Sequence, residues 1–322
     1  IDEEAFVRCS NLQTLHFNEK IQSIGNGAFS YCTNLKSFNF PIGVTQVSRN
    51  IFNQCINLES VIMHESITTI GKSAFGYCDS LKTITIPESV FSVGENCFEF
   101  CSNLTSITIP HNITIISDSM FISCKKLNSV TFLGNPTSIG SSAFHSCNFT
   151  TFQFPDSITS INQSAFRLCT NLISITIPEK VIIIEDSLFH SCSNLISVTF
   201  LGKITKFMQN AFYGCKNITS ISIPETVTTI GSYAFYECLK LSSISIPEAV
   251  TTIGSYAFYR CSNLSSISMN ENVESINTSA FQKCTSLTSI IIPKKITEIS
   301  SRLFDSCINL TSIQILGEIS TV

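Results

Sequence analysis

Apolar residues recur at fixed offsets along the chain, with a period of 23 residues. Fourteen phenylalanines mark this period, each followed three positions later by cysteine: Phe6, Phe29, Phe52, Phe75, Phe98, Phe121, Phe144, Phe166, Phe189, Phe212, Phe235, Phe258, Phe281 and Phe304. Such periods are typical of solenoids, in which each repeat is one coil that buries its apolar face only against its neighbours. The pattern predicts a single solenoid of about 14 coils over residues 1–322, whose function lies on a long surface.

The repeat that contains Phe98 predicts the elements of one coil. Leu104, Ile107 and Ile109 follow an L-x-x-I-x-I pattern, and its alternating end predicts a short strand with both isoleucines buried. Pro110 follows and ends the strand, because proline has no backbone donor for a ladder. Stacked at about 4.8 Å, the strands of successive coils are expected to form a parallel sheet on the concave face.

The second half of each coil predicts a bend and an outer turn. Residues 227–231 place a second apolar pair before a glycine, which permits a bend. In residues 232–238, Ala234, Phe235 and Cys238 have a spacing that favours a short helical or 3₁₀ turn with one face inward. These turns are expected on the convex side.

Fourteen of the fifteen cysteines belong to the periodic positions, and Cys97 takes a position held elsewhere by alanine. One inward thiol per coil predicts free, buried cysteines that pack as small apolar residues. Disulfides between stacked coils are disfavoured because their Cβ atoms point the same way. No C-x-x-C pair offers a zinc site, so we expect neither metal nor cofactor.

Composition excludes several classes of protein. Charged residues make up 13% and the net charge is −4, so nucleic acid is not an expected partner. No apolar run reaches the roughly 18 residues of a membrane span, and repetition does not bring together the different residue types that an enzyme needs. Ile1 and Val322 occupy the same repeat position without a polar cap, which predicts a fragment of a longer protein.

Variation among regular positions indicates where a partner would bind. Most outward strand positions hold serine or threonine, but the first four coils differ and predict one concave ligand-binding patch: Gln13, His16, Lys36, Asn39, Glu59, Ile62, Lys82 and Thr85. On the outer turns, four tyrosines either anchor a partner or simply cover the turns: Tyr233, Tyr236, Tyr256 and Tyr259. If the chain is secreted, four asparagines in sequons are candidate glycosylation sites: Asn112, Asn148, Asn162 and Asn277.

Residues 223–268, "IPETVTTIGSYAFYECLKLSSISIPEAVTTIGSYAFYRCSNLSSIS", closely resemble the BspA-like class of leucine-rich repeats. That class is found in surface proteins of anaerobic bacteria and parasitic protists. The resemblance implies a right-handed arc and a cell-surface or secreted location. It also implies adhesion through protein or glycan ligands on host cells, matrix or other microbes, although it defines no binding residue. One residue is missing after Cys147. An intracellular protein-interaction scaffold is the alternative.

Overall fold

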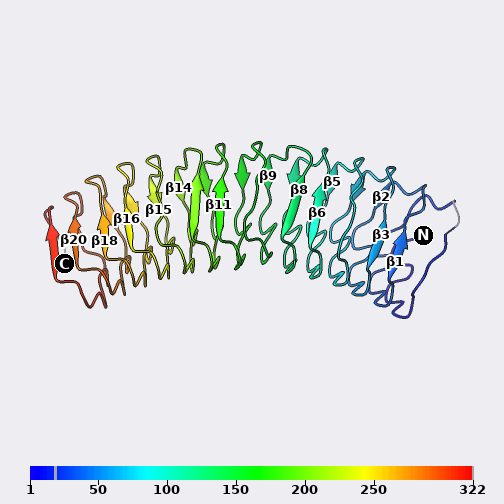
Figure 1. The fold of residues 1–322 in the computed structure, drawn as a ribbon, viewed down its shortest axis with the longest axis horizontal. Helices are drawn as coiled ribbons and strands as arrows, with labels where there is room; N and C mark the ends of the chain where they lie inside the picture. The colour runs from blue at the N-terminus through cyan, green and yellow to red at the C-terminus, as the bar shows by residue number, and fades with distance from the viewer. Residues whose placement is uncertain (18–19, 321–322) are drawn as a thin grey trace. The chain divides into compact units, whose positions relative to one another are not determined.

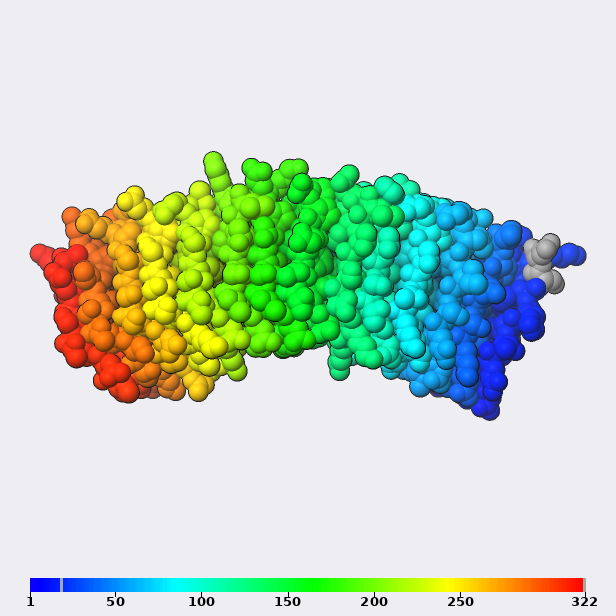
Figure 2. All heavy atoms as spheres, in the orientation of Figure 1, coloured from blue at the N-terminus to red at the C-terminus, as the bar shows by residue number. Residues whose placement is uncertain are grey.

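The chain forms a parallel-strand solenoid. The computed structural model describes residues 1–17 and 20–320; residues 18–19 and 321–322, including the Val322 of the predicted open end, lie outside the described part. Contacts divide the chain into two compact units, Ile1–Phe149 and Thr150–Val322. Within each unit the coils lie side by side in sequence order, and each coil forms a band in the space-filling view (Figures 1 and 2). The boundary follows Cys147, in the repeat that lacks one residue.

Strands on the inner face show the predicted alternation. In β6 (Ser106–Ile109), Ser106 and Thr108 are exposed while Ile107 and Ile109 are buried. This strand pairs in parallel with β8 (Ser129–Phe132) in a register that advances by 23 residues. The other inner strands are β1 (Ser37–Asn39), β3 (Ser60–Ile62), β11 (Ser174–Ile177), β13 (Ser197–Phe200), β16 (Ser243–Ser245), β18 (Ser266–Ser268), β20 (Ser289–Ile292) and β21 (Ser312–Ile315). They pair two at a time: β1 with β3, β11 with β13, β16 with β18, and β20 with β21.

A second row of two-residue strands follows the turn after the inner strands. Each buries its second residue, as Val93 does in β5 (Ser92–Val93). Parallel pairing joins β2 (Gln46–Val47) to β4 (Thr69–Ile70) to β5, and β7 (Ile115–Ile116) to β9 (Ser138–Ile139). It also joins β12 (Ile183–Ile184) through β14 (Lys206–Phe207), β15 (Thr229–Ile230) and β17 (Thr252–Ile253) to β19 (Ser275–Ile276). The sequence did not predict this row because two residues are too short to show alternation. The remaining member of the row is β10 (Ser160–Ile161), which lies beside β9.

The outer segments are series of β-turns, so the predicted helical or 3₁₀ turn is wrong. Tyr233 and Glu237 have φ of 59° and 54°, which a right-handed helix does not contain. The amide of Cys238 bonds back to Phe235, but the amide of Phe235 donates to the carbonyl of Ala257 in the next coil at 2.7 Å. In an α-helix, each interior amide donates a hydrogen bond to a carbonyl of the same helix. Here every second amide donates instead to a carbonyl of the neighbouring coil. In the described residues, no helix is long and apolar enough to cross a membrane.

Stacked phenylalanine rings form the core of each unit, as predicted. The rings of Phe75 and Phe98 lie 5.4 Å apart and within 4° of parallel. The twelve periodic phenylalanines from Phe29 to Phe281 are buried, and each contributes about 1.5–3 kcal/mol by burial. Phe6 and Phe304 are only half-buried because each belongs to a terminal coil. The structure therefore has about 12 complete coils rather than 14.

The cysteines are free, and all except Cys9 are buried, which confirms the prediction. Their thiols form a second ladder, in which the Sγ of Cys124 donates to the carbonyl of Phe98 in the preceding coil at 3.0 Å. Burial, with a smaller contribution from Cys9, raises the pKa of Cys32 to about 11, and burial places the pKa of Cys101 well above its ordinary value. The thiols are thus neutral and inert parts of the core.

Candidate functional site

Eight residues that the sequence predicted as a binding patch lie exposed on the inner face of the first unit. They form two rows across successive coils and are called the inner patch here: Gln13, Lys36, Glu59 and Lys82 in one row, and His16, Asn39, Ile62 and Thr85 in the other. Asn39 and Ile62 are opposite partners in β1 and β3, and the Glu59 amide donates to the Lys36 carbonyl at 2.8 Å. The structure therefore brings neighbouring members of each row together.

The strands position these side chains by alternation. Phe38 and Val61 point into the core, so Asn39 and Ile62 must point outward. Ile62 is 61% exposed and lies in its row between Asn39 and Thr85. The inner patch thus offers a partner an apolar side chain among amide, imidazole and hydroxyl groups.

Charge is concentrated in the first row of the inner patch. Glu59 lies between Lys36 and Lys82, one coil away from each. Across residues 1–17 and 20–320, no ion pair within 4.0 Å joins Glu59 to either lysine. Two ammonium groups and one carboxylate therefore remain available for contacts with another molecule.

A hollow lies at one edge of the inner patch. It has a volume of about 360 Å³ and is lined by His16, Asn39 and Ile42 together with neighbouring apolar residues. Ile42 is 76% exposed. The hollow is large enough for one or two side chains of a bound protein. The inner patch therefore combines a depression in the surface with chemically varied side chains.

The four predicted tyrosines lie together on the outer turns of the second unit, but their ring faces are largely covered. Tyr236 and Tyr259 stack at 4.6 Å, and Tyr233 and Tyr256 at 5.0 Å. Tyr213 extends the first stack at 4.4 Å from Tyr236. Burial, and then the neighbouring Tyr213 and Tyr259, raise the pKa of Tyr236 to about 12. This tyrosine ladder presents ring edges and hydroxyls rather than open faces, and it covers the turns.

The four sequon asparagines differ in exposure. Asn112 is exposed, and its side-chain amide donates to the Glu88 carbonyl of the preceding coil at 3.0 Å. Asn148, Asn162 and Asn277 are half-buried. Glycosylation at all four stays a prediction, and Asn112 is the most accessible acceptor among them.

A groove on the outer turns of the first unit was missed by the sequence reasoning. It has a volume of about 910 Å³ and is called the outer groove here. Its lining residues are Glu3, Glu4, Val7, Arg8, Asn26, Gly27, Ser30, Tyr31, Arg49, Asn50, Asn53, Gln54, Ser73, Tyr77 and Glu99. The groove exists because the position after the core phenylalanine holds a small side chain in successive coils, Ser30, Asn53 and Gly76. That run of small residues was the signal in the sequence.

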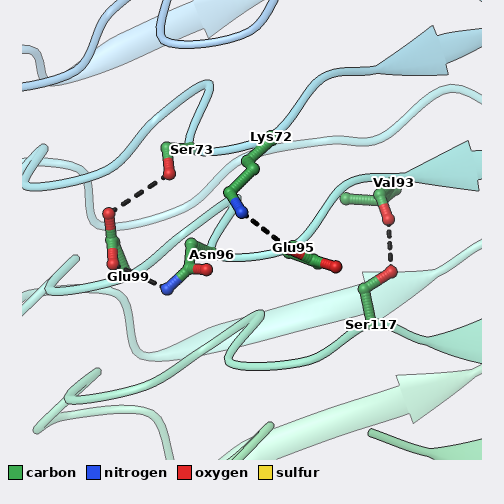
Figure 3. Close-up of polar contacts among 7 residues, drawn as sticks. All are labelled: Lys72, Ser73, Val93, Glu95, Asn96, Glu99 and Ser117. Atoms are coloured by element: carbon green, nitrogen blue, oxygen red, sulfur yellow. Dashed lines mark hydrogen bonds and ion pairs between the residues drawn. The ribbon is translucent and has the colours of Figure 1, made fainter.

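Hydrogen bonds organise one end of the outer groove. The Glu99 carboxylate accepts from Ser73 at 3.3 Å and from Asn96 at 2.8 Å (Figure 3). Among the described residues, no group of three or more histidines, cysteines, aspartates and glutamates is placed to hold a metal ion. The inner patch and the outer groove both present side chains that can form hydrogen bonds.

Comparisons with known proteins agree with this architecture. The family model described as "BspA type Leucine rich repeat region (6 copies)" matches residues 1–128, 92–219 and 205–322. A leucine-rich repeat protein of Bacteroides ovatus is 31% identical, with 92% of this chain and 83% of that chain covered and a TM-score of 0.79. A leucine rich cell surface protein of Faecalibacterium prausnitzii is 27% identical, with 91% and 83% covered and a TM-score of 0.56. No protein of curated function matches the chain.

Proposed function

Because the chain belongs to the family of BspA-type leucine-rich repeat proteins, we propose that it is a non-enzymatic binding module at the cell surface or in secreted form. In this role it mediates adhesion to host cells, matrix or other microbes through protein or glycan ligands. The similar Faecalibacterium chain is described as a cell surface protein, which supports the location. An intracellular interaction scaffold is the competing role.

The inner patch carries this proposal. Three successive coils hold Lys36, Glu59, Lys82 and Ile62 in an otherwise hydroxyl-rich face. Because the coils are fixed by a buried core, these side chains are presented without the cost of ordering a loop. Several such contacts, repeated over many copies on a surface, add by avidity even where each is weak.

The test is adhesion of the immobilised protein to host-cell surface components, compared with a variant that carries Lys36→Ser, Glu59→Ser and Lys82→Ser. We expect adhesion to fall at least severalfold. A matched control, Lys72→Ser, Glu95→Ser and Lys126→Ser, removes the same charges outside the inner patch and should bind like the parent. Lys72 and Glu95 form an exposed ion pair at 2.7 Å, which contributes little to stability.

Two results would overturn the proposal. Equal adhesion by both variants and the parent would remove the inner patch from the function. Protection of the protein from protease added to intact source cells, together with its absence from the medium, would favour the intracellular scaffold.

A further inference from the structure

We propose that the outer groove binds a neutral oligosaccharide. This inference rests on the proposed role as a binding module and names a ligand class and a second site for it. The site lies on the outer turns, in coils that also carry the inner patch, so the two surfaces are available to different ligands. The outer groove is both larger and more polar in its residues than the hollow beside His16.

Polar side chains from alternate coils converge at the floor of the outer groove. A methyl group at Gly76 would come 2.7 Å from the Asn53 side-chain nitrogen and 3.1 Å from a Glu99 carboxylate oxygen. An amide and a carboxylate thus reach over the glycine from the coils on either side. The carboxylate is held in place by Ser73, which is itself only 7% exposed. Such a preorganised pair can fix one sugar hydroxyl without prior rearrangement.

The chemistry of the lining matches hydroxyl groups better than ions. Amides can donate and accept hydrogen bonds, as sugar hydroxyls do, and the groove holds Asn26, Asn50, Asn53 and Gln54. Three glutamates and two arginines line it, so its formal charge is −1. A sulfated, phosphorylated or other polyanionic ligand would lack electrostatic attraction here.

Two tyrosines, Tyr31 and Tyr77, add partly apolar side chains to the lining of the outer groove. Tyr77 stacks on Phe100 at 4.6 Å, and the Arg8 guanidinium lies 5.5 Å from the Tyr31 ring centre. Each ring therefore has one face covered. In the part of the chain that the structure describes, no aromatic ring or cation contacts the second face of either tyrosine. Gln54, a flexible side chain, occupies the same row between the two tyrosines.

An extended peptide is a poorer fit because the backbone of the outer turns is already engaged. The amides of Tyr31 and Gln54 donate to the carbonyls of Asn53 and Gly76 in the next coils, both at 2.8 Å. A peptide that adds to a sheet edge needs free backbone donors and acceptors. Recognition in the outer groove thus falls to side chains, which suits a saccharide.

The experiment is calorimetric titration of the whole protein with cellohexaose, chitohexaose and maltohexaose, and with a heparin hexasaccharide as the anionic probe. Gly76→Tyr is designed to fill the outer groove with the residue that three coils of the second unit carry at this repeat position, as Tyr213, Tyr236 and Tyr259. The atoms nearest to a side chain at position 76 are the ends of the flexible Asn53 and Glu99 side chains, and the φ of Gly76 lies outside the left-handed region. Ile122→Tyr introduces the same ring at the same position two coils further on and serves as the control.

We expect at least one neutral hexasaccharide to bind, with affinity weakened at least tenfold by Gly76→Tyr and unchanged by Ile122→Tyr and by the triple inner-patch variant. Absence of binding by all three neutral probes, binding of heparin alone, or equal affinity in the Gly76→Tyr variant would overturn the inference. The two proposals can fail separately. Saccharide binding without cell adhesion would refute only the adhesion role, and adhesion lost by the inner-patch variant without saccharide binding would refute only this site.

Discussion

The outer turns of the two units have the same backbone conformation but carry different side chains. In both, paired residues with positive φ are spaced four apart, as Ser73 and Tyr77 are in the first unit and Tyr233 and Glu237 in the second. The position after the core phenylalanine differs. In three successive coils of the first unit it is small, at Ser30, Asn53 and Gly76, where the outer groove lies; in three successive coils of the second unit it is Tyr213, Tyr236 and Tyr259.

This difference shows that one repeat position decides whether the outer turns are hollow or filled. The backbone of the turns is fixed by hydrogen bonds between coils, so it does not respond to the side chain that it carries. The buried phenylalanine and cysteine ladders are common to both units. Stability is therefore expected to depend on the shared core, and recognition on the variable outer position.

The largest expected effect is alkaline unfolding of both units. The folded protein keeps its buried thiols neutral, and their pKa values are raised from 9.0, to about 11 at Cys32 and further in the interior. The stabilisation is complete below pH 9 and is lost as the pH rises through the raised values. We expect the urea midpoint to fall steadily between pH 9 and pH 11, measured under reducing conditions. A constant midpoint over this range would contradict burial of the thiols.

Truncating the core should affect both units equally. Phe75 lies 5.7 and 5.4 Å from its two neighbouring rings, and Phe235 lies 5.3 Å from each of its own. Phe75→Ala and Phe235→Ala should each reduce the free energy of unfolding by about 3–5 kcal/mol. Urea denaturation measures this loss. Phe91→Ala is the control, because this side chain is 58% exposed and should cost under about 0.5 kcal/mol.

The outer position should separate the units. The Tyr236 ring stacks on both sides, at 4.4 and 4.6 Å, and two aromatic pairs of about 0.5–1.5 kcal/mol each predict a loss of about 2 kcal/mol for Tyr236→Ala. Asn53→Ala, at the same repeat position in the outer groove, should change the free energy of unfolding by less than about 0.5 kcal/mol. Equal losses in urea denaturation would contradict the extra stability expected from the stacked tyrosine rings.

The core was predictable from the sequence because stacked coils require the same kind of side chain at each buried position. Phe98, Cys101 and Ile107 recur at positions where only a side chain of similar size fits between its neighbours, so the period alone places them. The inner patch followed from the same logic, since residues that alternate with buried ones must point outward.

The outer turns were not predictable because their apolar spacing suits a helix as well as a series of β-turns. The β-turns differ from a helix by left-handed backbone at residues such as Tyr233 and Ser187. Tyrosine and serine side chains do not predict this conformation. The outer groove was missed for a related reason. The groove depends on the lack of a side chain at Gly76, and on Asn53 and Glu99, which reach over this glycine from the coils on either side.

The smallest expected effect compares the cations that cover one exposed tyrosine face in each unit. Lys283 lies 5.2 Å from the Tyr259 ring centre and donates to its hydroxyl at 2.8 Å, whereas Arg8 contacts only the ring of Tyr31 at 5.5 Å. Cation–π contacts at exposed sites contribute about 0.5–1 kcal/mol. Double-mutant cycles that combine Lys283→Met with Tyr259→Leu, and Arg8→Met with Tyr31→Leu, isolate each coupling. We expect the larger coupling at Lys283, because the lysine terminates a ladder of stacked rings and its hydrogen bond fixes the ammonium over the last one. A larger coupling at Arg8 would instead show that the rim of the outer groove is the more rigid of the two outer surfaces.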